Sequence, residues 1–225
     1  MSTPCFRHEL KTQITPLDRE VLVRRLRTIA RPDPHAQGGF YTVRSLYFDT
    51  PQDKALREKL DGVDRREKFR LRSYNGDMTR IALEKKCKIR GLSQKTICPL
   101  TPDECRRLLR GDRSWMTRDG RKLVRELGSK MTLQGLQPKT LVDYRREPFV
   151  YPPGNVRVTI DSHIRTGLYD TDFFQPVAPF LSGDNPMILE IKYDAFLPDL
   201  IDWAVRPAFR AQSAFSKYAH CRRFG

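Results

Sequence analysis

Alternation between charged and apolar side chains is the dominant pattern of this chain. In residues 64–72 every second position from Arg66 to Arg72 is basic, and apolar side chains stand between the last three of these. A period of two places each set on one face of a β-strand. The basic set is Arg66, Lys68, Arg70 and Arg72, and the apolar set is Phe69 and Leu71. The segment therefore predicts a strand with one wholly basic face.

Four further segments share this design. Their charged or polar positions are Arg7, Glu9 and Lys11 in residues 6–11, Glu84, Lys86 and Lys88 in 80–88, Arg157, Thr159 and Asp161 in 156–161, and Glu190 and Lys192 in 189–193. An ordinary antiparallel sheet with one solvated face alternates in the same way. Four neighbouring cations repel one another, however, and a solvated face is usually of mixed composition. We therefore expect a sheet that curls, with the charged faces lining a lumen and the apolar faces packing outward against helices.

Helix start signals supply the elements that would cover the outside of this sheet. Thr15-Pro16 and Thr101-Pro102 each place a capping threonine before a proline at the first helical position. Thr50-Pro51 predicts a helix to about Leu60, and Pro198-Asp199 predicts another. Apolar spacing also indicates helices over 114–126 and 213–222. Strands and helices together predict an α+β fold.

Composition adds a strong positive charge to this picture. The 225 residues include 42 Lys+Arg against 27 Asp+Glu, a net charge of +15, which favours an anionic partner. The length and the 39% hydrophobic content suit one domain over residues 1–225. We see no apolar run of the roughly 20 residues that a transmembrane helix needs, and no secretion signal, so we expect a cytoplasmic protein. The scattered cysteines predict reduced thiols and no zinc site.

A lumen lined by lysine and arginine is stable only when counter-charges or water neutralise it. A phosphate chain would serve as that counter-charge. The interspersed carboxylates Glu9, Glu84, Asp161 and Glu190 would orient the cations or hold a divalent metal that bridges phosphate oxygens. For Glu9 and Asp161 we favour the first of these roles.

Seven short motifs follow one another along the chain. They are E-x-K (Glu9, Lys11), K-x-R-x-R (Lys68, Arg70, Arg72), E-x-K (Glu84, Lys86), Y-x-R (Tyr144, Arg146), R-x-T-x-D (Arg157, Thr159, Asp161), L-E-I-K (Leu189 to Lys192) and F-S-K-Y (Phe215 to Tyr218). In this order, from about residue 5 to 220, the chain resembles the catalytic domain of the vacuolar transporter chaperone (VTC) family. These are polyphosphate polymerases of the triphosphate tunnel metalloenzyme superfamily. The resemblance implies a closed antiparallel β-barrel tunnel with flanking helices, which binds ATP and inorganic polyphosphate or triphosphate with Mn²⁺ or Mg²⁺.

The resemblance also implies a role for each matching position. The catalytic residues would be Arg70, Arg72, Lys86, Arg146 and Arg157, further phosphate ligands would be Lys11, Lys68, Lys95, Lys192 and Lys217, and the metal ligand would be Glu190. Lys88 and Arg90 are alternative matches for the family position that we assign to Lys95. Lys68 and Lys192 are second choices, assigned only because alternation places them on the lumen face.

Phosphoryl transfer needs positioning and charge neutralisation rather than a protein nucleophile, so such a tunnel needs no catalytic His or Cys. The expected reaction is transfer of the ATP γ-phosphate to a growing polyphosphate chain. Hydrolysis of triphosphate or polyphosphate by water is the nearest alternative, and a non-catalytic polyphosphate-binding module is another. Nucleic acid is not the expected partner, because no helix-turn-helix, zinc finger or RNP1-like strand is visible. The sequence does not indicate the oligomeric state.

Overall fold

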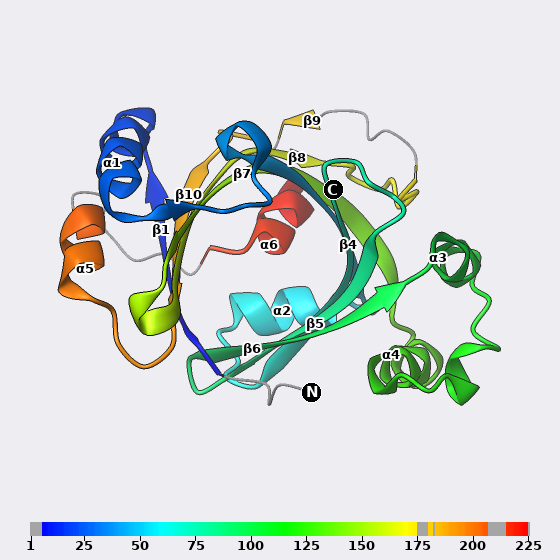
Figure 1. The fold of residues 1–225 in the computed structure, drawn as a ribbon. Coiled ribbons are helices and arrows are strands. Elements are labelled where there is room, and N and C mark those ends of the chain that lie inside the picture. Colours follow the sequence, from blue (N-terminus) through cyan, green and yellow to red (C-terminus); the bar gives the residue numbers. More distant parts are fainter. Residues whose placement is uncertain (1–5, 175–179, 182, 207–214, 225) are drawn as a thin grey trace.

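The computed structural model describes residues 6–174, 180–181, 183–206 and 215–224, and its strands form one ten-stranded antiparallel sheet (Figure 1). The main path runs β1-β10-β8-β7-β3-β4-β5-β6, with β2 on β7 and β9 on β8. The strands are β1 (His8–Ile14), β2 (Arg31–Pro32), β3 (Tyr41–Asp49), β4 (Arg66–Tyr74), β5 (Ile81–Ile89), β6 (Leu92–Leu100), β7 (Gln137–Tyr151), β8 (Val156–Thr166), β9 (Phe180–Leu181) and β10 (Met187–Tyr193).

The sheet curls until its two edge strands approach each other. β1 and β6 meet at one bridge, where Arg7 and Ser93 exchange backbone hydrogen bonds of 2.9 and 3.0 Å. Among the described residues the ladder between these edges is limited to this bridge. The expected antiparallel sheet curled around a lumen is therefore confirmed. In the described residues it is an open barrel rather than the closed barrel that the resemblance implies, because its hydrogen bonding is not continuous around the circumference.

The helices divide into those outside the curl and those within its outline (Figure 1). They are α1 (Pro16–Ile29), α2 (Lys54–Leu60), α3 (Pro102–Leu109), α4 (Lys122–Leu133), α5 (Asp199–Val205) and α6 (Lys217–Cys221), with 3₁₀ turns η1 (Gln37–Gly39), η2 (Met116–Arg118), η3 (Pro153–Asn155) and η5 (Arg222–Phe224). α1 and α5 cover one flank and α3 and α4 the other, whereas α2 and α6 lie within the outline. No described helix has the length and apolar character needed to cross a membrane.

Two apolar clusters hold the outer helices against the sheet. One joins the outward faces of β4 and β5, including Phe69, Leu71 and Leu83, to α3 and α4. The other joins β8 and β10 to Leu22 and Leu26 of α1 and the buried face of α5. The apolar members of each alternating strand thus face outward, as the period of two predicts. The charged members are left facing the lumen.

A third apolar cluster lies inside the curl. Tyr218 and Cys221 of α6 pack there against Tyr47, Tyr144 and Ile188 on the inner face of the sheet. Tyr218 is 1% exposed, and its hydroxyl donates a 2.6 Å hydrogen bond to Asp49 at the end of β3. α6 therefore occupies part of the lumen, and it carries Lys217 inward.

Helix starts follow the sequence signals where a capping side chain is present. Thr15 and Thr101 each form the expected capping box, which confirms α1 and α3, and α5 follows Pro198 as expected. The helix expected from Thr50-Pro51 begins late, at Lys54, because the Thr50 hydroxyl accepts from the Lys54 amide and Asp53 is left-handed with φ of 56°.

The two helices expected from apolar spacing are also shifted. Over 114–126 the chain forms the η2 turn first and begins α4 only at Lys122. The Asp119 carboxylate accepts from the Arg121 amide and breaks the helix at that point. The helix expected over 213–222 is the shorter α6, and residues 213 and 214 lie outside the described part of the chain.

Candidate functional site

The lumen cations gather around buried carboxylates, and Glu84 on β5 forms the first centre. Arg70 Nε donates to Glu84 Oε2 at 2.8 Å, Arg72 Nη1 lies 3.5 Å from the same oxygen, and Lys95 Nζ lies 3.4 Å from Oε1. Glu84 is 2% exposed. Burial alone would raise the pKa of Glu84, but Arg70, Arg72 and Lys95 hold that pKa well below its usual range. Glu84 is therefore an anion that fixes three cations from β4 and β6.

Two tyrosines orient the same arginines from neighbouring strands. Tyr47 Oη accepts from Arg70 Nη1 at 3.1 Å, and Tyr144 Oη accepts from Arg72 Nη2 at 2.9 Å. Ser45 Oγ also accepts from Arg72 Nε at 3.3 Å. Burial raises the pKa of Tyr144 to about 12, so its hydroxyl stays protonated. The register of β3 against β4 pairs Ser45 with Arg72 and Tyr47 with Arg70, which places both residues on the lumen face.

Glu9 and Glu190 form the second centre, on adjacent strands β1 and β10. Lys11 Nζ lies 3.0 Å from Glu9 and 3.6 Å from Glu190. Lys86 Nζ is 2.5 Å from Glu9, and Lys192 Nζ is 3.3 Å from Glu190. Burial works against ionisation of Glu190, yet Lys192 and Lys11 lower its pKa well below the usual range. Burial and Lys11 lower the pKa of Lys86 to about 7, against the attraction of Glu9.

Asp161 on β8 is the third centre and is fully buried. Arg146 grips it through two hydrogen bonds of 2.6 and 2.8 Å, and Lys217 of α6 adds a third contact at 2.5 Å. Burial opposes its charge, but Arg146 and Lys217 lower the pKa of Asp161 to about 2. Arg146 also lies 3.3 Å from Glu190, which joins the second and third centres. Asp161 is thus an ion-pair partner, as we favoured.

Two of the expected site residues lie apart from these centres. Arg157 donates to the buried Asp33 and, at 2.8 Å, to Tyr41 Oη. The side chain of Lys68 donates to Ser216 Oγ at 3.2 Å. Sequence reasoning missed Asp33, since it precedes β3 and follows no alternation.

The second centre also meets the requirements of a divalent metal. Lys11 Nζ contacts both Glu9 and Glu190, so the two carboxylates lie around one ammonium group. Among the described residues no cluster of three or more His, Cys, Asp or Glu could hold a metal. Mg²⁺ usually needs only one or two carboxylates, because substrate phosphates and water complete its shell. Glu190 with Glu9 therefore suits a metal that arrives with phosphate.

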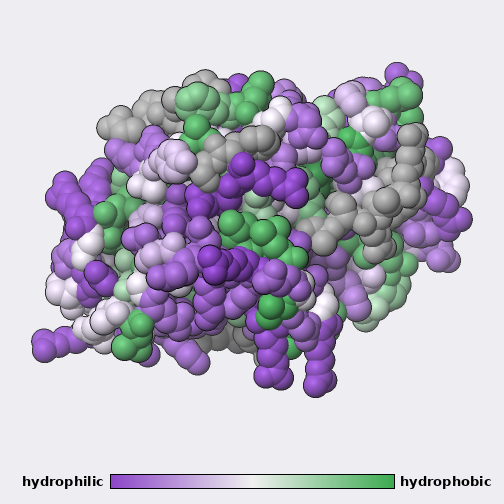
Figure 2. All heavy atoms as spheres, turned by 180° about the vertical axis from the view of Figure 1, so that it is seen from behind, coloured by the Kyte–Doolittle hydropathy of each residue, from purple (hydrophilic) through white to green (hydrophobic). Residues whose placement is uncertain are grey.

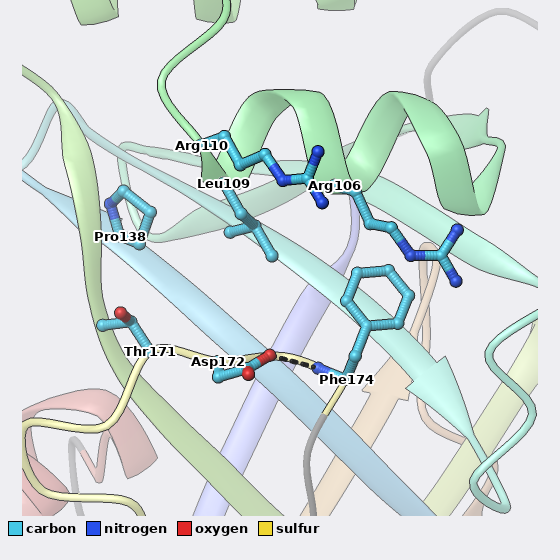
Figure 3. A pocket seen from close by; sticks show the side chains of 7 residues that line it. All are labelled: Arg106, Leu109, Arg110, Pro138, Thr171, Asp172 and Phe174. Atoms are coloured by element: carbon cyan, nitrogen blue, oxygen red, sulfur yellow. Dashed lines mark hydrogen bonds between the residues drawn. The ribbon is translucent and has the colours of Figure 1, made fainter.

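A separate cavity of about 450 Å³ lies outside the curl, beside α3 (Figure 3). It is lined by Arg106, Leu109, Arg110, Pro138, Thr171, Asp172 and Phe174. None of the expected site residues lines it. The face of the molecule seen from behind is mostly hydrophilic, with apolar side chains in small groups (Figure 2). The lumen is thus where the expected residues converge.

Solved structures share this architecture. A structure of HpAC1 from Hippeastrum, described with a dominant triphosphatase activity, has a TM-score of 0.60 at 13% identity, with 97% of this chain and 96% of that chain covered. An adenylate cyclase candidate from Bacillus halodurans has a TM-score of 0.54 at 13% identity, with coverages of 91% and 87%. Identities this low show the fold alone. What this chain shares with them is the fold, an antiparallel sheet curled around a lumen with helices on its flanks.

Comparison with family models identifies the family of this chain. The VTC domain model matches residues 6–224, and the chain belongs to this family. Comparison with curated proteins gives no match.

Proposed function

We propose that this protein is a polyphosphate polymerase, which transfers the γ-phosphate of ATP to a growing inorganic polyphosphate chain in the lumen. The observation that carries the proposal is the set of cations held by Glu84, Glu9, Glu190 and Asp161. They come from six strands (β1, β4, β5, β6, β7 and β10) and from α6, and they outnumber the carboxylates that fix them. A linear polyanion supplies the missing negative charge without rearranging the site.

The side chains suit different parts of this reaction. Carboxylates and hydroxyls hold Arg70, Arg72 and Arg146 in place, and these fixed positive charges stabilise phosphate oxygens without reorganisation. Lysines such as Lys86 and Lys192 provide point charges that follow a developing negative charge. A divalent metal on Glu190 and Glu9 supplies, when bound, further neutralisation of phosphate oxygens.

The proposed reaction involves one bond formed and one bond broken. A terminal oxygen of the polyphosphate chain forms a new bond to the γ-phosphorus of ATP, and the bond from that phosphorus to the β,γ-bridging oxygen breaks. ADP leaves with the electron pair of the broken bond. The cations balance the charge that shifts onto the bridging oxygen, so no His or Cys nucleophile is needed.

Hydrolysis is the second candidate, because the HpAC1 structure that shares this fold is described with a dominant triphosphatase activity. The same lumen would then admit water where the polymerase admits a phosphate chain. Product analysis distinguishes the two reactions. The purified protein is incubated with γ-labelled ATP and Mn²⁺, with and without a polyphosphate primer, and the products are separated by size.

Label in long chains with matching ADP supports the polymerase, and label only in orthophosphate supports the hydrolase. Tight polyphosphate binding without turnover would leave a binding module. Arg72→Ala should lower turnover by about 10²-fold or more in either enzyme, as loss of a fixed charge-stabilising donor does. Arg80→Ala is the matched control, since Arg80 is exposed outside the lumen. Full activity in Arg72→Ala would exclude the assigned role.

A further inference from the structure

The cavity beside α3 lies outside the lumen and is lined by a different set of side chains (Figure 3). One wall is α3, and the opposite wall is the segment that follows β8. Its volume of about 450 Å³ falls within the range of about 300 to 1,000 Å³ that is typical of small-molecule sites. None of the lumen cations lines it. The cavity is therefore a candidate site for a ligand of its own.

A guanidinium group and an aromatic ring lie against each other at one end of the cavity. The Cζ atom of Arg106 is 4.8 Å from the centroid of the Phe174 ring. The Phe174 ring in turn meets the ring of Phe173 edge-on, at a centroid distance of 6.0 Å, and Phe173 is fully buried in the core beside α3 and α4. Nucleobases stack on aromatic rings and on the flat faces of arginine side chains. This end of the cavity therefore suits a planar heterocycle.

Arg110 brings a second positive charge to the cavity. It is the C-cap residue of α3 and lies four positions after Arg106, so both side chains project from one face of the helix. In the described part of the chain neither arginine forms an ion pair within 4.0 Å, whereas Arg107 of the same helix is paired with Asp112. An arginine without a counter-charge favours an anionic ligand, and its planar fork matches the oxygens of a phosphate group.

Asp172 makes a simple inorganic anion a poor fit for this cavity. Its Oδ1 accepts a hydrogen bond from the Phe174 amide at 3.1 Å, which fixes the carboxylate in the wall opposite α3 (Figure 3). A carboxylate repels phosphate, but it accepts hydrogen bonds from ribose hydroxyls, as an acidic residue does in dinucleotide sites. Thr171 lines the same wall, and a threonine hydroxyl both donates and accepts. The cavity thus combines groups that suit a base, a sugar and a phosphate.

We propose that the cavity beside α3 binds a nucleoside phosphate. The base stacks on Arg106 and Phe174 at one end. The ribose hydroxyls donate to the Asp172 carboxylate, and the phosphate accepts from the Arg110 guanidinium. This site is separate from the lumen, so the inference does not depend on the proposed function. It gives the protein a second place for a nucleotide, apart from the lumen in which ATP reacts in the proposed function.

Titration calorimetry with AMP tests the inference, because AMP carries a base, a ribose and a phosphate but no phosphate chain to lie along the lumen. We expect saturable binding of AMP by the wild type, with a Kd that an excess of inorganic tripolyphosphate leaves unchanged. Arg110→Gln should raise the Kd by about tenfold or more, as loss of a hydrogen bond to a charged group does. Phe174→Leu should raise it by about fivefold or more, through loss of base stacking. A thermal melt checks that both variants are folded.

Arg118→Gln is the matched control, since it removes one positive charge from an exposed residue of η2 that does not line the cavity. This variant should bind AMP as the wild type does, and a loss equal to that of Arg110→Gln would overturn the inference. So would a wild type that does not bind AMP, or cavity variants that bind it unchanged. Displacement of AMP by tripolyphosphate would also overturn it, because AMP would then occupy the lumen or a site for any phosphate. A protein that binds AMP as expected but forms no product from ATP would support the inference and refute the proposed function.

Discussion

Glu84→Gln should destabilise the protein without ligand, because Glu84 holds Arg70, Arg72 and Lys95 around one buried carboxylate. Removing one partner of a buried ion pair costs about 3 to 5 kcal/mol. Arg70 keeps Tyr47, and Arg72 keeps Tyr144. We therefore expect the lower end of the range, a loss of about 3 kcal/mol in the free energy of unfolding.

Urea denaturation followed by tryptophan fluorescence measures this loss, since Trp115 packs against the core beside α4. In a thermal melt the same loss corresponds to a Tm lower by about 6 to 12 °C for a chain of this size. Glu20→Gln is the matched control, because its side chain is 58% exposed and its ion pair is worth less than about 1 kcal/mol.

The loss should depend on pH and on phosphate in a defined direction. Because the folded pKa of Glu84 lies below its ordinary value of 4.5, its contribution is present above that value and disappears as the pH falls below it. Saturating tripolyphosphate should raise the Tm of Glu84→Gln more than that of wild type, since phosphate replaces the lost negative charge. A variant as stable as Glu20→Gln at pH 7 would refute the view that Glu84 holds these cations together.

Three further outcomes follow from the site. Glu190→Gln should raise the Mn²⁺ concentration needed for half-maximal turnover, and an unaltered metal dependence would assign the metal to another carboxylate. Phosphate binding should be accompanied by proton uptake near pH 8, because the pKa values of Lys68 and Lys86 are lowered to about 7 and a bound anion restores their charged forms. Calorimetry in buffers of different ionisation enthalpy detects this proton uptake, and a binding enthalpy that does not depend on the buffer would contradict the prediction. Tyr218→Phe removes the hydrogen bond to Asp49 and should lower the free energy of unfolding, measured by urea denaturation, by about 1.5 to 3 kcal/mol. An unchanged free energy of unfolding would show that this hydrogen bond does not hold α6 in place.

Local features of the sequence were sufficient for five of the ten strands, namely β1, β4, β5, β8 and β10, and for three helix starts. The alternation in β4 separates Arg70 and Arg72 from Phe69 and Leu71, because side chains point to opposite faces at every step. The capping boxes at Thr15 and Thr101 involve residues three positions apart, so the sequence alone contains all their atoms. α2 began late because a hydrogen bond from the Lys54 amide to Thr50 and a left-handed Asp53 are turn features that a Thr-Pro signal does not reveal.

The ordered motifs also predicted which cations the lumen would contain. They could not predict which carboxylate each cation would meet, because those partners lie far apart along the chain. Lys217 reaches Asp161 only because α6 enters the curl, and Arg157 meets Asp33 only through the pairing of β7 with β8 and β2.

The sequence by itself therefore determined five strands and their charged faces, and it predicted the cations of the candidate site. Tertiary structure decided the three carboxylate centres, the inward position of α6 and the single bridge between β1 and β6. The physical reason is that alternation depends on adjacent residues, whereas ion pairing and closure depend on strand register and curvature, which the whole sheet sets together.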